Sequence, residues 1–156
     1  MNSNPKYSIL EIERRWLVNE AKLPDLEYLV YFIIEDLYID NSRLRLRKMY
    51  NDKECIYKLG KKYGKTSIMS EPIVNIYLSR QEYEMFCGIL SGKKLARKRY
   101  KYNYKGHNFS ITTCEKYPII AECEFTNEQS ALSCQVPQWC AKEITAEFEA
   151  ISFAHC

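Results

Sequence analysis

Residues 9–18 have the sequence Ile-Leu-Glu-Ile-Glu-Arg-Arg-Trp-Leu-Val, in which charged and apolar side chains alternate. Successive side chains of a β-strand point to opposite faces of its sheet. Glu11, Glu13 and Arg15 therefore share one face of the predicted strand, and Ile12 and Trp16 share the other. The segment predicts a strand with one charged face and one apolar face.

The same alternation recurs in three later segments, each with charges of one sign on one face: Glu122 and Glu124; Arg43, Arg45 and Arg47; Arg97 and Arg99. In a single strand such a face ordinarily meets solvent. Its recurrence in several strands favours a closed barrel, whose interior has room for side chains or one small ligand. A cavity lined by carboxylates and by cations predicts a polyanion bound together with a metal ion.

The pattern of apolar residues and turns predicts one α+β domain over residues 1–156. Tight turns between consecutive strands make the sheet antiparallel. Ser79 and Glu82 fit a capping box that begins a helix ending near Leu90. Strands are expected at residues 7–18, 28–39, 43–50, 54–59, 67–77, 94–104, 108–114 and 119–125, with a second short helix at 127–132 and a basic loop at 60–65. If the charges point inward, helices must cover the apolar outer faces.

Composition excludes several classes of protein. The net charge of +3 is mild and the basic residues are interleaved with acidic ones, so nucleic acid is not indicated. The seven cysteines include no CxxC pair, which favours reduced, core-filling thiols over a zinc site or disulfide framework. No signal peptide is visible, and the longest apolar run, Leu29–Ile34, is too short to span a bilayer. We expect a cytoplasmic protein without a membrane partner.

Six charged segments follow one another along the chain: Glu11-Ile12-Glu13-Arg14-Arg15; Tyr38 with Arg43-Leu44-Arg45-Leu46-Arg47; Lys58; Arg97-Lys98-Arg99-Tyr100; Glu122-Cys123-Glu124; and Glu143-Ile144-Thr145. In this order they resemble the ExExK, RxR, lysine, KxRY, ExE and EVT elements of the CYTH domain, the triphosphate tunnel metalloenzyme family. The resemblance covers almost the whole chain and is strongest to the family's short bacterial tripolyphosphatases.

The resemblance implies an eight-stranded antiparallel closed β-barrel, the triphosphate tunnel, with a few helices packed outside. It implies Mg²⁺ or Mn²⁺ held by four carboxylates: Glu11, Glu13, Glu122 and Glu124. It implies a triphosphate gripped by basic side chains: Arg15, Arg43, Arg45, Lys58, Arg97 and Arg99. Arg97 and Tyr38 are the expected catalytic residues, which orient or deprotonate the attacking water. Arg47 is expected at the tunnel rim. Hard cations prefer oxygen ligands and arginine binds phosphate bidentately, so the physical chemistry agrees.

Four positions depart from the pattern that the resemblance implies. Arg15 and Arg97 stand in place of lysines, Ile73 in place of a second glutamate after Glu71, and Thr112 in place of an aspartate. Arginine is a poor base, so turnover that needs a base at Arg97 would be slow. Two hypotheses remain open: a metal-dependent triphosphatase, and a catalytically weak or inactive module that binds polyphosphate or nucleotide.

The substrate of such a triphosphatase is expected to be inorganic tripolyphosphate, with nucleoside and thiamine triphosphates as alternatives. An adenylate cyclase is less favoured, because nothing in the sequence marks an adenine pocket. An RNA-binding barrel is disfavoured because inward carboxylates would repel phosphates in the absence of metal. The oligomeric state stays open.

Overall fold

Nine strands make one antiparallel sheet in the computed structural model, which describes residues 4–147. Two α-helices and two 3₁₀ turns, η1 (Glu20–Lys22) and η2 (Leu26–Tyr28), complete the described elements. The strands and helices are β1 (Ile9–Val18), β2 (Tyr31–Ile39), β3 (Leu44–Tyr50), β4 (Cys55–Lys62), β5 (Ser70–Leu78), α1 (Arg80–Ile89), β6 (Gly92–Tyr104), β7 (His107–Cys114), β8 (Tyr117–Phe125), α2 (Glu128–Ser133) and β9 (Cys140–Glu143).

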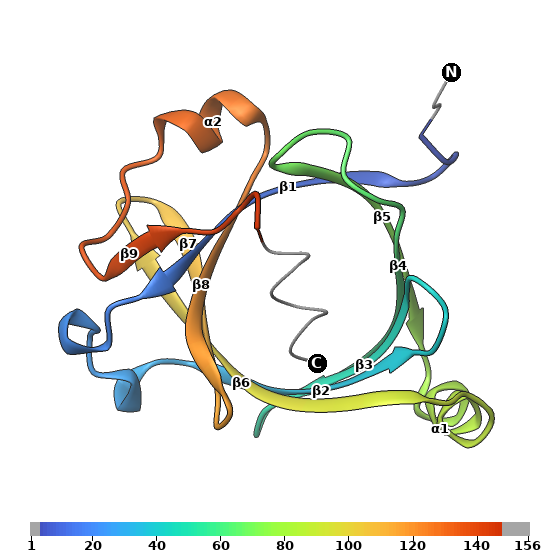
Figure 1. Ribbon diagram of the computed structural model, residues 1–156. Helices are drawn as coiled ribbons and strands as arrows, with labels where there is room; N and C mark the ends of the chain where they lie inside the picture. The colour runs from blue at the N-terminus through green and yellow to red at the C-terminus, as the bar shows by residue number, and fades with distance from the viewer. Residues whose placement is uncertain (1–3, 148–156) are drawn as a thin grey trace.

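Eight of these strands close into a ring, seen in Figure 1 along the barrel axis. Their order is β5-β4-β3-β2-β6-β7-β8-β1, and pairing of β1 with β5 completes the barrel, with Glu11 opposite Glu71. The expected eight-stranded antiparallel closed barrel is therefore confirmed. The sequence did not predict β9, which pairs with the C-terminal end of β1.

The apolar core lies outside the barrel wall. Trp16, Phe109 and Cys123 point outward from β1, β7 and β8, and they are buried beneath Cys134 and Trp139 from the segment that joins α2 to β9. The ring centroid of Phe109 lies 5.7 Å from that of Trp16 and 5.8 Å from that of Trp139. This core holds the outward apolar faces of β1, β7 and β8, and the cavity on the other side of the wall is lined mainly by charged side chains.

Helices cover less of the outer surface than expected. Helix α1 packs against β3, β4 and β5, where Tyr83 stacks on Tyr57 at 4.8 Å between ring centroids. Both bonds of its predicted capping box form, since the Ser79 hydroxyl accepts from the Glu82 amide and the Glu82 carboxylate accepts from the Ser79 amide. The β1–β7–β8 face is covered mainly by α2, β9 and the segment between them (Figure 1).

Several strand boundaries differ from the prediction by one to three residues, and the end of β4 affects the site. Strand β4 runs through Gly60 to Lys62, where a loop was expected from Gly60 onward. A Cβ at Gly60 would lie 2.7 Å from the Asn75 side-chain oxygen, so this glycine marks close packing within the sheet and not a break. Strand β2 begins at Tyr31 and not at Tyr28, because Asp25 caps the turn η2 before it.

No helix among residues 4–147 has both the length and the apolar character needed to cross a bilayer.

Candidate active site

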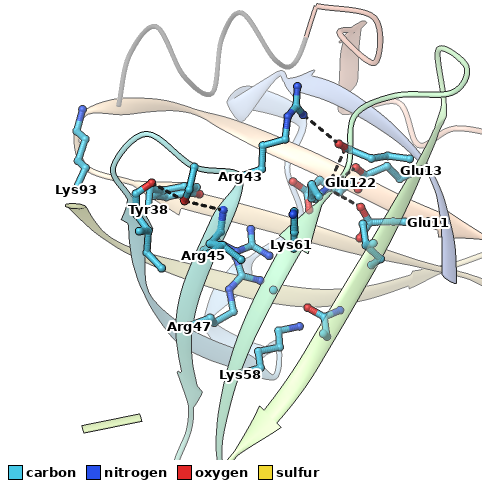
Figure 2. A pocket seen from close by; sticks show the side chains of 18 of the residues that line it. Glu11, Glu13, Tyr38, Arg43, Arg45, Arg47, Lys58, Lys61, Lys93 and Glu122 are labelled. Carbon is cyan, nitrogen blue, oxygen red and sulfur yellow. Dashed lines mark hydrogen bonds and ion pairs between the residues drawn. The ribbon is translucent and has the colours of Figure 1, made fainter. Parts of the chain in front are cut away.

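The barrel encloses a cavity of about 410 Å³. Its lining is dominated by charged side chains, and Figure 2 shows Tyr38, Arg45 and Lys58 directed into it. Tyr38 is the one aromatic residue of the lining within residues 4–147. The volume lies within the usual range for small-molecule sites, and the apolar residues of the described lining are Ile39, Leu44 and Ile73.

The cavity has two walls of opposite charge. The adjoining strands β4, β3, β2 and β6 form the basic wall, which presents Lys58, Arg45, Arg47, Arg97 and Arg99. The adjoining strands β8, β1 and β5 form the acidic wall, which presents Glu122, Glu124, Glu11, Glu13 and Glu71. The strand order therefore places cations and carboxylates on opposite sides of one cavity.

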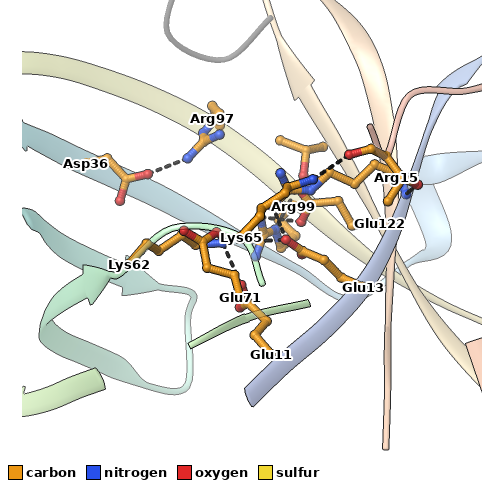
Figure 3. Close-up of polar contacts among 12 residues, drawn as sticks. Glu11, Glu13, Arg15, Asp36, Lys62, Lys65, Glu71, Arg97, Arg99 and Glu122 are labelled. Carbon is orange, nitrogen blue, oxygen red and sulfur yellow. Dashed lines mark hydrogen bonds and ion pairs between the residues drawn. The ribbon is translucent and has the colours of Figure 1, made fainter. Parts of the chain in front are cut away.

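Asp36 is a carboxylate embedded in the basic wall, with a fully buried side chain. It accepts two hydrogen bonds from Arg47, at 2.7 and 2.8 Å. It accepts a further one from Arg97, which Figure 3 shows. Arg45 lies 3.9 Å away. Burial alone would raise the pKa of Asp36, but the bonds and charges of these arginines hold that pKa well below its usual range. Asp36 is thus ionised, and it fixes the positions of two guanidinium groups.

Lys58 faces the same cavity from β4, opposite Arg47 in the strand pairing. Burial, with the charges of Arg47 and Arg45, lowers the pKa of Lys58 to about 8. Both effects disfavour the ammonium form. Lys58 is therefore a cavity cation that can lose its proton in mildly alkaline solution.

Tyr38 lies beside Arg97 at the β2–β6 pairing. The Arg97 guanidinium donates a hydrogen bond of 3.2 Å to the Tyr38 hydroxyl oxygen, which leaves the hydroxyl hydrogen available to another acceptor. The Arg97 Nε atom is buried and has no hydrogen-bond partner in the described chain. The pair therefore has unused hydrogen-bonding capacity.

Internal cations neutralise part of the acidic wall. Arg15 contacts Glu13 at 2.6 Å and Glu122 at 3.3 Å, and Arg99 reaches Glu122 from the basic wall at 3.0 Å (Figure 3). Burial opposes ionisation of Glu122, but Arg99 and Arg15 hold its pKa below the usual range. Lys62 contacts Glu11 at 2.5 Å.

Glu124 differs from the other carboxylates. Within residues 4–147 its side chain accepts no hydrogen bond and forms no ion pair. Burial, followed by the neighbouring charges of Glu11 and Glu122, raises the pKa of Glu124. Burial also raises the pKa of Glu13 despite the nearby Arg15. Crowded carboxylates with raised pKa values favour the arrival of another cation.

Comparisons with protein-family models and with curated protein sequences give no match. Solved structures do match. The inorganic triphosphatase NE1496 is 23% identical, with 88% of this chain and 87% of that chain covered and a TM-score of 0.54. PH1819 protein from Pyrococcus horikoshii OT3 is 16% identical, with 90% and 87% covered and a TM-score of 0.58. A candidate adenylate cyclase (bh2851) from Bacillus halodurans is 16% identical, with 90% and 98% covered and a TM-score of 0.57.

The chain has the triphosphate tunnel fold. The fold implied by the resemblance to the CYTH domain is thereby confirmed.

All of the predicted site residues lie in the tunnel lining, but three differ in setting from what the sequence suggests. Arg47 was expected at the rim, and this is wrong, because its side chain is 4% exposed and bound to Asp36. Arg43 is the residue at the mouth, with a side chain 53% exposed and 3.8 Å from Glu71. Arg15 lies in the acidic wall and not among the other predicted phosphate ligands.

Two of the four departures from the pattern that the resemblance implies, Ile73 and Thr112, put a neutral side chain where a carboxylate is expected. Ile73 is buried and lines the cavity where the resemblance implies a carboxylate. Thr112 is buried on β7, and its hydroxyl accepts a hydrogen bond of 3.3 Å from Arg99. The tunnel therefore has fewer carboxylates than the resemblance implies.

Sequence reasoning missed Asp36, Lys62 and Glu71 as tunnel residues. Asp36 lies two residues before Tyr38, so the alternation of strand side chains could have placed both on one face. Lys62 has the same parity as Lys58, but the strand was expected to end before it. Glu71 was noted only for the missing carboxylate that follows it.

The donor chemistry of the acidic wall fits a hard divalent cation. The described residues contain no group of three His, Cys, Asp or Glu side chains arranged to hold a metal. Mg²⁺, however, is usually bound by one or two carboxylates together with substrate phosphates, and not by an all-protein cage. The unpaired Glu124 and its neighbour Glu122 supply such a pair, so the site suits a cation that binds with a phosphate ligand.

Proposed function

We propose that this protein is a metal-dependent phosphohydrolase that acts on a triphosphate, with inorganic tripolyphosphate as the foremost substrate. The observation that carries the proposal is the pair of opposed walls, basic and acidic, in one cavity of about 410 Å³. A polyanion with a divalent cation on one side matches that arrangement. The fold shared with a protein named as an inorganic triphosphatase supports the same reaction class.

The basic wall would hold the phosphate chain. Arg45, Lys58 and Arg99 are the central contacts in this proposal, since arginine and lysine form charge-assisted bonds with phosphate oxygens. Arg97, whose Nε lacks a partner in the described chain, would donate a hydrogen bond to a phosphate that lies beside β6. Arg43 at the mouth and Arg15 in the opposite wall are the outer members of the proposed set.

The acidic wall would hold Mg²⁺ or Mn²⁺. Glu122 and Glu124 are the principal proposed ligands, with Glu11 and Glu13 as the secondary ones. Such a cation would neutralise charge on the phosphate chain and would reduce the repulsion between the phosphates and these carboxylates. The raised pKa of Glu124 supports this assignment, because a bound cation would offset the burial and the like charges of Glu11 and Glu122 that raise it.

Water attack would involve Tyr38, Arg97 and Lys58. Tyr38 and Arg97 are the proposed orienting pair, because each has hydrogen-bonding capacity that its neighbours leave unused. Arginine cannot act as a base near neutral pH. Lys58, with a pKa of about 8, can take a proton from the attacking water, so we assign it that role in addition to phosphate binding.

The lining favours an inorganic chain over a nucleotide. Adenine and thiamine rings bind in apolar or aromatic slots, and Tyr38 is the one ring that lines the described cavity. Its hydroxyl is already bonded to Arg97. Nucleoside and thiamine triphosphates, and a cyclase reaction, are therefore the less favoured possibilities.

The alternative function is a module that binds polyphosphate or nucleotide with weak or no turnover. The observation in its favour is the internal neutralisation of the acidic wall by Arg15, Arg99 and Lys62. Those ion pairs compete with metal binding, and catalysis without the metal would be slow.

Phosphate release from tripolyphosphate, ATP and thiamine triphosphate tests the proposal, with Mg²⁺, Mn²⁺ or EDTA at pH values from about 6 to 10. We expect release from tripolyphosphate to be fastest and to stop in EDTA. If tripolyphosphate binds in calorimetry but releases no phosphate under any condition, the binding module is the correct reading.

The metal assignment is tested by Glu122→Gln combined with Glu124→Gln. Neutral amides keep the shape but lose the charge that holds a hard cation, so we expect turnover and Mg²⁺ dependence to disappear together. Glu115→Gln, in the exposed turn between β7 and β8, is the control with wild-type kinetics. Unchanged turnover in the double variant would exclude this metal site.

A further inference from the structure

Lys62 lies among three carboxylates of the acidic wall. Its ammonium nitrogen is 2.5 Å from Glu11, 3.5 Å from Glu13 and 3.8 Å from Glu71 (Figure 3). The lysine extends from the end of β4, whereas the carboxylates come from β1 and β5. The three carboxylate side chains are only 9–15% exposed.

Three carboxylates this close repel one another and need a cation between them. In many proteins a divalent metal ion fills that role through oxygen ligands. Here the role belongs to a covalently attached ammonium group, which is present whether or not metal is in solution. Burial raises the pKa of Glu13, and the charge of Lys62 is among those that oppose this rise, so the lysine favours the ionised wall.

We propose that Lys62 is a tethered counter-ion that fills the position among Glu11, Glu13 and Glu71 which a second divalent cation would otherwise occupy. The tunnel then takes one divalent cation, at Glu122 and Glu124, and this part rests on the proposed function. Glu11 and Glu13 serve Lys62 first and the metal second. The number of metal ions that the acidic wall takes is thus limited to one by a lysine at the end of β4.

Mn²⁺ binding without any phosphate substrate tests the proposal, with free Mn²⁺ counted by electron paramagnetic resonance. Lys62→Met removes the ammonium while keeping much of the side-chain length. We expect this variant to bind one more Mn²⁺ per chain than the wild type, and Mn²⁺ to raise its melting temperature more than that of the wild type. An equal number of bound Mn²⁺ ions in variant and wild type would overturn the proposal.

Lys61→Met is the matched control, since Lys61 lies one residue earlier and its ammonium contacts the Tyr63 ring instead of a carboxylate. The same loss of charge there should leave the Mn²⁺ count unchanged, and a gain would assign the effect to net charge and overturn the proposal. Lys62→Arg should also keep the wild-type count.

Glu71→Gln in the otherwise wild-type chain keeps the proposal falsifiable if Lys62→Met does not fold. We expect no loss of bound Mn²⁺ from this variant, because Lys62 already occupies the position beside Glu71. Loss of a Mn²⁺ ion would contradict the proposal. Neither measurement requires turnover, so failure of the proposed triphosphatase activity would be seen separately in the phosphate-release assay.

Discussion

Asp36 sits at the centre of the basic wall and determines how two of its arginines are held. Its carboxylate receives both donors of the Arg47 fork and one donor of Arg97. Like-charged guanidinium groups would repel each other in this buried place without it. The arrangement presents Arg45 and Lys58 to a ligand while keeping Arg47 fixed behind them.

Asp36→Asn should be strongly destabilising, because it leaves buried arginines without their counter-charge. We expect a loss of about 3 kcal/mol in the free energy of unfolding, measured in urea. Glu35→Gln is the control on the same strand. Glu35 is paired with Lys48 at the surface and should change stability by no more than about 1 kcal/mol.

The role of Asp36 also predicts how the stability of the protein changes with pH. The pKa of Asp36 is lowered in the folded protein, so its contribution is present above the unfolded value of about 4 and is lost as pH falls further. The Asn variant should lose less stability than the wild type on acidification below about pH 4. A variant as stable as the wild type near neutral pH would contradict the role assigned to Asp36.

Lys58 predicts the pH dependence of catalysis. Since the pKa of Lys58 is lowered to about 8, kcat/KM for tripolyphosphate should rise with pH and level off above that value. Lys58→Arg keeps the positive charge but cannot lose a proton, so we expect the inflection to vanish and the rate to fall about 10²-fold or more.

Lys48→Arg, on the outer face of β3, is the control for this measurement and should retain the wild-type profile. An inflection near pH 8 that persists in Lys58→Arg would assign the base to another residue.

At the scale of elements, the close approach of β2 and β6 sets the position of Tyr38. A Cβ at Gly92, the first residue of β6, would lie 1.9 Å from the carbonyl oxygen of Tyr38 and 2.7 Å from its carbonyl carbon. No side chain fits there without separating the two strands. Glycine at this point therefore allows the pairing that carries Tyr38 and Arg97 into the tunnel.

Gly92→Ala should destabilise the protein by about 1–3 kcal/mol and reduce kcat, because the strands must separate beside Tyr38. Gly88→Ala in α1 is the matched control. It meets no atom within 4 Å and should raise helix stability by up to about 1 kcal/mol, with kcat unchanged. Denaturant unfolding and steady-state kinetics on both variants would decide, and wild-type values for Gly92→Ala would show that the close approach has no role.

Alternation within the strands was the part of the structure that the sequence predicted well. It placed Glu11, Glu13 and Arg15 inside and Trp16 outside, because a two-residue period depends only on local geometry. Gly60 misled the prediction, because a glycine at a close contact between strands looks the same in sequence as one in a loop. Because the predicted strand ended before Gly60, Lys62 was not predicted to face the tunnel.

Ion-pair partners within the site could not be predicted in the same way. Asp36 meets Arg97 through pairing of β2 with β6, two strands that are distant in sequence and joined by no hairpin. Strand β9 was missed for a related reason, since its four residues pair only with β1, at the far end of the chain. Local pattern holds little information on such contacts.

At the scale of the whole molecule, the barrel wall has a large apolar core on its outer side and the charged cavity on its inner side. The core of Trp16, Phe109 and Trp139 lies outside the barrel wall, so the interior is free to carry the two charged walls. The strand order puts β4, β3, β2 and β6 together and β8, β1 and β5 together. This order makes the cavity bipolar, and the proposed function depends on that bipolarity.

A crystal structure with tripolyphosphate and Mn²⁺, with the metal located by its anomalous scattering, would show whether the two walls bind a phosphate chain and a metal ion. If the wild-type protein hydrolyses tripolyphosphate in the crystal, the Glu124→Gln variant would be used to trap the intact phosphate chain. We predict a phosphate chain inside the barrel against Arg45, Lys58 and Arg99, and in the wild type one Mn²⁺ between that chain and the Glu122–Glu124 pair. Phosphate bound only outside the barrel, or Mn²⁺ bound away from the acidic wall, would contradict the account.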